Sequence, residues 1–239
     1  MLKKEELQRI ITKAQTSPIN VYREYCQHLV LSLLYTQKAS EQVLFKGGTA
    51  LRVAYQSPRF SEDLDFTLFN ISNRKIEDLL LLVSEGLQQN NLSNQIVEAK
   101  KTTGGYLSKL IIDLYQEKVT ILIQGSRRKK NHRKANVQLV RNEYIPQYTL
   151  LLLPELELIT EKIQAALTRT KPRDLFDVYF LLRQGLVPVE LRGKLKKLVE
   201  IVADNQVNFT GLANFLPASM AVLVKSFKDS FITEVNKFG

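Results

Sequence analysis

One segment, from Phe45 to Phe66, constrains this chain more than any other. It reads FKGGTALRVAYQSPRFSEDLDF, so a Gly-Gly pair opens a short helical stretch and two acids, Asp63 and Asp65, follow on a strand. Alternate residues of a strand point to the same face, so these carboxylates stand side by side while Leu64 faces the core. Adjacent carboxylates repel each other unless a cation or a shared proton lies between them. The segment therefore favours a cation site.

The residues before the two acids indicate which chemistry this site serves. Free backbone N–H groups at a helix start form an anion site, and the Gly-Gly-Thr turn at residues 47–49 offers such a start. Oxygen ligands beside a phosphate-sized loop suit Mg²⁺ (or Mn²⁺) bound together with nucleotide phosphates. Either feature alone has an ordinary explanation, as a solvated strand end or a turn. Separated by one short helix, they favour phosphoryl or nucleotidyl transfer.

A second informative segment lies far downstream and reads ELELITEKIQAALTRTKPRDLFDVYFLL, from Glu155 to Leu182. Pro172 suits the first turn of a helix, where its missing N–H costs nothing. Asp177 lies deeper in that helix, among apolar residues, and needs a partner, for which Lys162 is the candidate. A purely structural ion pair between these two side chains explains the pattern equally well.

The two segments together resemble the signatures of a known family. KGGTALR with RFSEDLDF, followed by the lysine helix and KPRDLFD, is similar to the motifs of the AbiEii/AbiGii-type nucleotidyltransferase toxins. The resemblance implies an α+β fold, with a polymerase-β-like nucleotidyltransferase core on a small mixed sheet and a helical C-terminal bundle. It also implies two domains, residues 1–150 and 151–239, of which the second contributes Lys162 and Asp177 to the site.

The same resemblance implies roles for individual residues. Asp63 and Asp65 are expected to bind the metal, and Lys162, oriented by Asp177, to neutralise charge on the phosphates. The residues expected to bind the nucleotide are Lys46, Gly47, Gly48, Thr49, Arg59 and Ser61.

Polymerase-β-like enzymes complete the metal site with a third acid on a neighbouring strand. Asp113, in the apolar stretch LIIDLY, is the expected third ligand, although a solvent-facing edge position explains this residue as well.

The charge of the chain favours a polyanionic partner. With 34 Lys and Arg against 24 Asp and Glu, the formal net charge is +10. Six basic residues occur within RRKKNHRK at positions 127–134. A solvated loop is one interpretation, and contact with the phosphate backbone of a nucleic acid is the other. In the second interpretation the contacting residues are Arg127, Arg128, Lys129 and Lys130.

The resemblance also implies what the protein acts on. It implies a toxin of a toxin–antitoxin, phage-defence system that uses a nucleoside triphosphate to extend an RNA acceptor, the 3′ end of tRNA. A cognate AbiEi-type antitoxin would restrain it. Two alternatives stay open: transfer to a protein hydroxyl, as in AMPylation, and a nucleotide-binding module without activity.

Two further observations bear on location. The single cysteine, Cys26, excludes an intramolecular disulfide and fits a reducing compartment. No apolar run approaches the ~20 residues that a membrane-spanning helix needs. We therefore expect a soluble, cytoplasmic protein without a membrane partner.

Periodicity predicts the elements that carry these motifs. Helical spacing covers residues 5–14, 21–36 and 76–90, and the pattern is helical again from residue 155 onward. Strands are predicted at 43–45 and 64–69, with a hairpin formed by 107–115 and 119–124.

Overall fold

A computed structural model describes residues 1–128, 134–203 and 207–238 of the chain. The chain divides into two compact units. The first comprises Met1–Gln56 and Phe60–Pro154, and the second comprises Ser57–Arg59 together with Glu155–Gly239. The second unit thus takes three residues from the middle of the Gly-Gly-to-acid segment, which the sequence does not indicate.

A seven-stranded mixed sheet forms the centre of the first unit, in the order β3-β4-β5-β2-β1-β7-β6. The pairs β1–β7 and β2–β5 are parallel, and the other neighbouring pairs are antiparallel. The strands are β1 (Val43–Lys46), β2 (Leu64–Leu68), β3 (Asn94–Thr102), β4 (Gly105–Leu114), β5 (Glu117–Arg127), β6 (Asn136–Val140) and β7 (Tyr148–Leu152).

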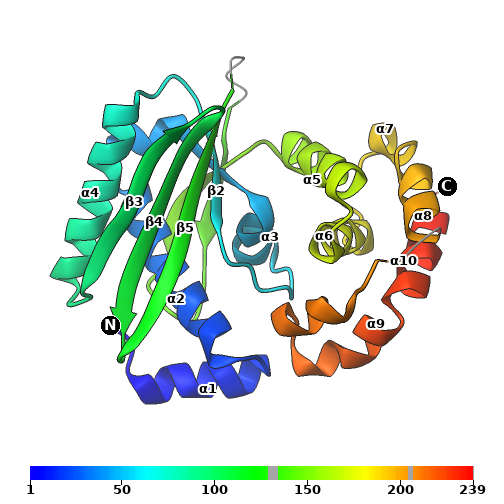
Figure 1. Cartoon of the computed structure of the whole chain (residues 1–239), viewed down its shortest axis with the longest axis horizontal. Coiled ribbons are helices and arrows are strands. Elements are labelled where there is room, and N and C mark those ends of the chain that lie inside the picture. The colour runs from blue at the N-terminus through cyan, green and yellow to red at the C-terminus, as the bar shows by residue number, and fades with distance from the viewer. Residues whose placement is uncertain (129–133, 204–206, 239) are drawn as a thin grey trace. The chain divides into compact units, whose positions relative to one another are not determined.

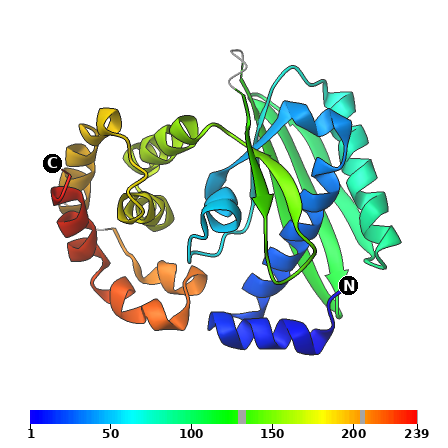
Figure 2. The same ribbon diagram turned by 180° about the vertical axis from the view of Figure 1, so that it is seen from behind.

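Helices α2 and α4 cover one face of this sheet, while β3, β4 and β5 present the other face toward the viewer in Figure 1. Figure 2 shows the helical side, with α2 running across the strands. The helices of this unit are α1 (Lys4–Ala14), α2 (Pro18–Tyr35), the 3₁₀ helix η1 (Lys38–Gln42), α3 (Gly47–Tyr55) and α4 (Asn73–Gln89).

The two faces of the sheet differ because the side chains alternate along each strand. On β2, Leu64, Phe66 and Leu68 are buried in the core, whereas Asp65 points to the opposite face and is half-buried. Phe45 of β1 lies opposite Phe66, with ring centroids 5.4 Å apart. The polar residues of the motif therefore occupy the face that α2 and α4 leave uncovered.

The second unit is helical and has its own aromatic core. The ring of Phe227 packs against Phe176 and Phe231 at centroid distances of 5.8 and 6.1 Å. Its elements are α5 (Glu155–Arg169), α6 (Pro172–Arg183), α7 (Val189–Arg192), α8 (Leu195–Ala203), η2 (Thr210–Phe215), η3 (Ala218–Met220), α9 (Ala221–Lys225) and α10 (Phe227–Asn236).

The fold agrees with the predicted class of a mixed sheet followed by helices, and the structure adds three strands. The predicted helices and the predicted hairpin are present; the first hairpin strand begins two residues earlier than predicted, and the second is longer at both ends. Strands β3, β6 and β7 are not anticipated by the sequence patterns. Within the described residues, no helix is both long enough and apolar enough to cross a membrane.

Candidate active site

The turn from β1 into α3 is built around Gly47 and lies against Asp65. Gly47 has φ +87°, a left-handed conformation that side chains other than glycine rarely adopt. A Cβ atom at this position would lie 2.8 Å from the Cβ of Asp65 and would overlap its carboxylate. Lys46 pairs directly with Asp65 across β1 and β2. The glycine therefore lets the start of α3 approach the carboxylate closely.

Asp63 and Asp65 are half-buried on either side of buried Leu64, as the strand pattern predicts. Strand β2 begins at Leu64, so Asp63 directly precedes it. The approach to the strand is fixed by side chains from two helices. Gln27 of α2 donates to the carbonyls of Ser61 and Glu62 at 3.0 and 2.9 Å.

The Thr49 hydroxyl of α3 completes this fixation by donating to the carbonyl oxygen of Asp63. Thr49 and Gly48 are buried, which differs from the expectation that residue 49 contacts the nucleotide. The structure gives Thr49 a positioning role: it ties α3 to the backbone that carries the two acids.

A cavity of about 320 Å³ lies beside Asp65 in the first unit, and it is lined in part by Lys46, Asp65 and Gln124. These three side chains come from the adjacent strands β1, β2 and β5, at neighbouring register positions. The Lys46 Nζ donates to the Ser126 Oγ at 2.9 Å. The cavity thus brings a cation, a carboxylate and an amide to one wall, and the sequence does not point to Gln124 at all.

Asp113 is not near this wall, and its assignment as the third metal ligand is wrong. Asp65 pairs with Gln124, and Gln124 pairs with Leu107 of β4. Asp113 is exposed and lies six residues farther along β4, roughly 20 Å away at the rise of a strand. It pairs instead with Lys118 beside the hairpin turn. The residue on the neighbouring strand next to Asp65 is the neutral Gln124.

The second unit contains a buried cluster centred on Asp177 of α6. Its carboxylate accepts from Lys162 of α5, with Nζ and Oδ2 2.7 Å apart, which confirms the predicted contact. Arg59 donates two hydrogen bonds to the same carboxylate, from Nε to Oδ1 at 2.8 Å and from Nη2 to Oδ2 at 2.9 Å. Asp177 is completely buried, and the other two side chains are nearly so. One carboxylate therefore serves two cations from distant parts of the chain.

The charges of this cluster keep Asp177 ionised. Burial alone would raise the pKa of Asp177, but the attraction of Arg59 and Lys162 and their hydrogen bonds outweigh it, so the pKa is lowered from its usual value. The guanidinium that the sequence assigns to phosphate binding is thus engaged by Asp177. Sequence patterns give no sign of this contact, because 118 residues separate Arg59 from Asp177.

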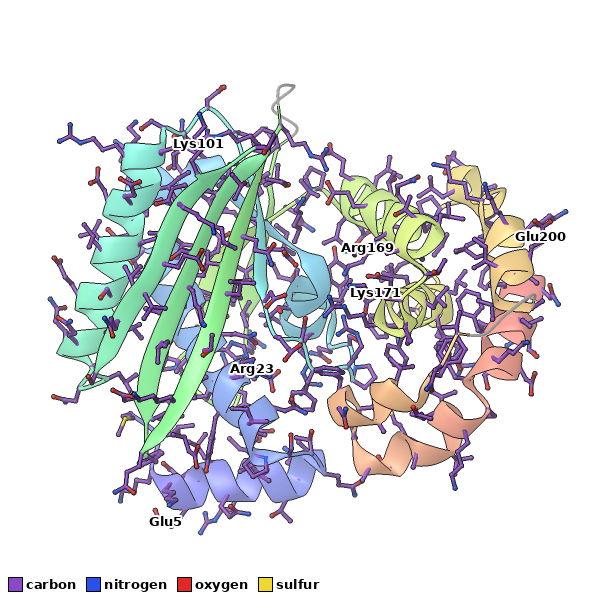
Figure 3. All side chains as sticks on the ribbon, viewed as in Figure 1. Glu5, Arg23, Lys101, Arg169, Lys171 and Glu200 are labelled. Carbon is purple, nitrogen blue, oxygen red and sulfur yellow. The ribbon has the colours of Figure 1, made fainter. Side chains whose placement is uncertain are left out.

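The start of α6 sets the position of Asp177. Pro172 occupies the first turn after Lys171, as predicted, and Asp174 bonds to Arg169 at the end of α5 with 2.9 Å between Nη2 and Oδ1. Arg169 and Lys171 are marked in Figure 3, on either side of the turn that joins α5 to α6. This turn brings the two helices into contact, so that Lys162 faces Asp177.

The basic run is only partly described. The Arg127 guanidinium donates to the Ile71 carbonyl and to the Asn73 side chain, so this residue is tied to the start of α4. Arg128 is exposed. The predicted contacts of Lys129 and Lys130 lie outside the described residues.

Comparison with known proteins identifies the family. Residues 30–235 match the family described as nucleotidyl transferase AbiEii toxin, type IV toxin–antitoxin system. The chain belongs to this AbiEii family. It is a nucleotidyltransferase of the toxin type, and its membership implies a nucleoside triphosphate substrate and an antitoxin partner. A comparison with curated proteins finds no match.

Solved structures share the fold of this AbiEii-family chain. JHP933 from Helicobacter pylori is 20% identical, with a TM-score of 0.69 and 93% of each chain covered. The nucleotidyltransferase toxin MenT4 from Mycobacterium tuberculosis is 17% identical, with a TM-score of 0.64, and the match covers 100% of this chain and 93% of MenT4. At these identities the likeness concerns the fold.

The family suggests a divalent metal, and the donor set of the first unit suits one. Asp63 and Asp65 offer half-buried carboxylate oxygens, and the missing side chain of Gly47 lets the Asp65 carboxylate occupy a position that a Cβ atom would overlap. Among the described residues, no three acidic, histidine or cysteine side chains gather into a group that could hold a metal ion. The set fits a cation whose remaining ligands come from the nucleotide and water.

Proposed function

We propose that this AbiEii-family toxin transfers a nucleoside monophosphate from a nucleoside triphosphate to an RNA acceptor, the 3′ end of tRNA, with Mg²⁺ or Mn²⁺ as cofactor. The observation that carries the proposal is the polar wall of the first unit. There Asp65 lies between Lys46 and Gln124 and against the Gly47 turn. This arrangement combines a cation site with room for phosphate oxygens.

Asp63 and Asp65 would hold the cation, which supplies charge neutralisation at the transferring phosphate when bound. Lys46 lies beside Asp65 and would bind a phosphate oxygen, exchanging its bond to Ser126 for one to the substrate. The backbone N–H group of Gly47, which is half-buried, would donate to a further phosphate oxygen at the start of α3. Ser61, half-buried just before the acids, would add a hydroxyl.

Asp177 would act in the same reaction through Lys162 and Arg59. A buried carboxylate that fixes two cations presents them in one orientation, and positioned charge is what phosphoryl transfer chiefly requires. Chain connectivity supports a shared role, because only three residues separate Arg59 from Asp63. Under this proposal Lys162 neutralises charge on the phosphates, and Asp177 orients it.

The positive net charge of the chain favours RNA as acceptor over a protein hydroxyl. A protein acceptor stays the second candidate, because the polar wall of the first unit serves either transfer equally well. An inactive module is the third, and the intact set of Asp63, Asp65, Lys162 and Asp177 argues against it. We further propose that an AbiEi-type antitoxin restrains the enzyme during phage defence in the cytoplasm.

The decisive experiment incubates the pure protein with each labelled nucleoside triphosphate, Mg²⁺, and either total RNA or a protein extract. Label in RNA of tRNA size supports the proposal, and label in protein alone replaces it with the second candidate. Asp113→Ala provides the matched control for Asp65→Ala, because both acids lie on the same face of the sheet, roughly 20 Å apart. The proposal expects loss of transfer in Asp65→Ala only. Equal activity of both variants would refute the metal role of Asp65.

A further inference from the structure

The first unit contains a second, larger cavity that the proposed reaction does not use. It has a volume of about 390 Å³ and lies between α1, α2, the C-terminal half of α3 and the connection from β6 to β7. It shares no lining residue with the cavity at Lys46 and Asp65. A volume of this order suits a small metabolite.

The two carboxylates of this cavity are already paired. Glu24 is buried and accepts from the Arg52 Nε at 2.6 Å and from the Tyr144 hydroxyl at 2.8 Å. Glu143 at the rim forms an ion pair with Lys13 of α1. Carboxylates paired in this way have little left to offer a cation or a hydrogen-bond donor.

Two donor groups of the lining, by contrast, have no partner among the residues that the structure describes. The Asn142 Nδ2 is buried and has no hydrogen-bond partner within the described parts of the chain. Its Oδ1 accepts from the backbone N–H groups of Tyr144 and Ile145 at 2.8 and 2.9 Å, so the side chain is held in place. The neighbouring Arg141 makes no hydrogen bond or ion pair with the described residues. A buried donor without a partner is costly unless a ligand or water satisfies it.

The side chains that line the cavity carry a net positive charge. Lys13, Arg52 and Arg141 stand against Glu24 and Glu143, which leaves one positive charge. His28 adds none near neutral pH, since burial lowers its pKa to about 4. An anion is therefore the ligand that this lining can accept without an opposing charge.

We propose that this cavity binds a small oxyanion, a phosphate or carboxylate group, at Asn142 and Arg141, with the rest of the ligand against Ile10, Ala14 and Val53. Helix α3 connects the two cavities of this unit, since Gly47 begins it and Arg52 and Val53 line the second cavity. Nine helical residues span only about 13 Å. A ligand here would thus contact the helix that holds the two candidate catalytic acids in place, and would act as an effector.

Inorganic phosphate, acetate and AMP serve as probes, titrated by calorimetry against the full chain. Asn142→Asp is the sharpest variant, because it keeps the oxygen that caps residues 144 and 145 and replaces the donor by a negative charge. We expect affinity to fall at least tenfold in Asn142→Asp and several-fold in Arg141→Ala. Arg9→Ala, an exposed arginine of α1 outside the cavity, should bind like wild type. Preference for phosphate or for acetate identifies the oxyanion, and tighter binding of AMP supports an organic ligand.

Asp65→Asn separates this site from the proposed active site. If it leaves phosphate binding unchanged while Asn142→Asp weakens it, the second cavity is the binding site. Loss of binding in Asp65→Asn together with retention in Asn142→Asp would overturn the proposal, as would the absence of saturable binding by every probe. Unchanged melting temperature in Asn142→Asp shows that the variant is folded; if it is not, Arg141→Ala decides by the same criterion.

Discussion

The acids of the first unit and the acid of the second unit are held in opposite ways. Asp63 and Asp65 are half-buried on an open sheet face, beside a cavity and a glycine turn. Asp177 is completely buried and accepts three hydrogen bonds from two cations. The first arrangement leaves carboxylates accessible at some electrostatic cost, whereas the second commits a carboxylate to fixed partners. The acids of the first unit are therefore accessible to a substrate, whereas the acid of the second unit contributes to stability.

This contrast means that loss of activity has two different origins in the two units. Removing the half-buried Asp65 relieves its repulsion with Asp63. Removing Asp177 leaves the cations of Arg59 and Lys162 buried without their shared partner, and such losses typically cost 3–5 kcal/mol. A variant of each acid, measured for both activity and stability, tests the contrast directly.

The largest expected effect is on activity in Asp65→Ala. We predict that nucleotide transfer falls at least a thousandfold, about 4 kcal/mol of transition-state stabilisation, while the free energy of unfolding changes by less than about 1 kcal/mol. Asp177→Ala is expected to lower the free energy of unfolding by about 3–5 kcal/mol as well as activity. Denaturant unfolding and initial rates measure the two quantities. A large stability loss in Asp65→Ala, or none in Asp177→Ala, would break the contrast.

A double-mutant cycle sharpens the second half of this comparison. We predict that Lys162→Ala and Asp177→Ala each lose most activity and that the double variant is scarcely worse than either, because the two residues act as a unit. In denaturant unfolding the double variant should be no less stable than Asp177→Ala, since Lys162→Ala removes a cation that the loss of Asp177 deprives of its partner, whereas Lys162→Ala alone leaves Asp177 bonded to Arg59. Additive losses in both measurements would show that the two residues contribute independently.

The dependence of the free energy of unfolding on acidic pH should also distinguish the two units. Burial lowers the pKa of His28 in the first unit to about 4, whereas an unfolded chain protonates histidine near 6.5. The unfolded state therefore binds more protons between these values, and stability falls as the pH drops from 6.5 to about 4, by about 3 kcal/mol. The lowered pKa of Asp177 makes its own loss begin only at lower pH, below the pKa of an unfolded aspartate.

His28→Asn tests this assignment, because its amide oxygen can replace the Nδ1 that bonds to the Tyr148 hydroxyl at 2.9 Å. We expect the variant to lose stability overall but to show a flatter pH dependence between 6.5 and 4 in urea unfolding. An unchanged slope would place the titrating group elsewhere. Asp177→Asn should leave this pH window unaltered and flatten the dependence below it.

The sequence predicts the parts of the fold and the site that rest on local rules. The Gly-Gly-to-acid segment and the role of Pro172 can be predicted because each depends on a few neighbouring residues. These residues set the turn, the face to which each strand side chain points, and the start of the helix. The contact between Lys162 and Asp177 is predictable because an acid in an apolar helix needs a partner. The half-exposed β3 and the short edge strand β6 carry weak periodicity, so they were not foreseen.

Contacts set by register or by long chain separation could not be predicted in this way. Asp113 has the right residue type and strand parity, but only the pairing of β4 with β5 shows that it lies at the wrong end. Gln124 occupies the neighbouring position that a third acid was expected to fill. The position of Arg59 beside the acids in the sequence suggests a phosphate contact, whereas its bonds to Asp177 depend on the tertiary fold.

A smaller effect is expected from introducing an acid at position 124, next to Asp65. Gln124→Glu places a third carboxylate beside Asp65, and we predict about tenfold tighter Mn²⁺ binding in the nucleotide complex, about 1.4 kcal/mol. Electron paramagnetic resonance of Mn²⁺ measures this without relying on activity. Thr120→Glu, on the same face of β5 but nearer the hairpin turn, is the matched control and should not change the affinity. Equal gains in both variants would indicate a general charge effect rather than a ligand.

The smallest expected effect concerns the basic run, and it tests whether the acceptor is RNA. Arg127 is tied to Ile71 and Asn73, so its replacement would also disturb the start of α4. We therefore predict the outcome for Arg128→Ala, Lys129→Ala and Lys130→Ala combined: a raised apparent KM for RNA and a weaker salt dependence. Each lost phosphate contact should remove about one unit from the log–log salt slope.

Affinity for the nucleoside triphosphate should stay constant in this triple variant, because we place that substrate at Lys46, Gly47 and the two acids. Removal of the same number of basic residues from α8 and α10, as in Lys196→Ala, Lys197→Ala and Lys228→Ala, controls for net charge. If both triple variants lower the slope equally, the RNA is attracted by overall charge. If neither does, the basic run is a solvated loop. A loss of triphosphate affinity in the first variant alone would extend the active site of the first unit to this run, and the open sheet face would then not be the whole of the substrate surface.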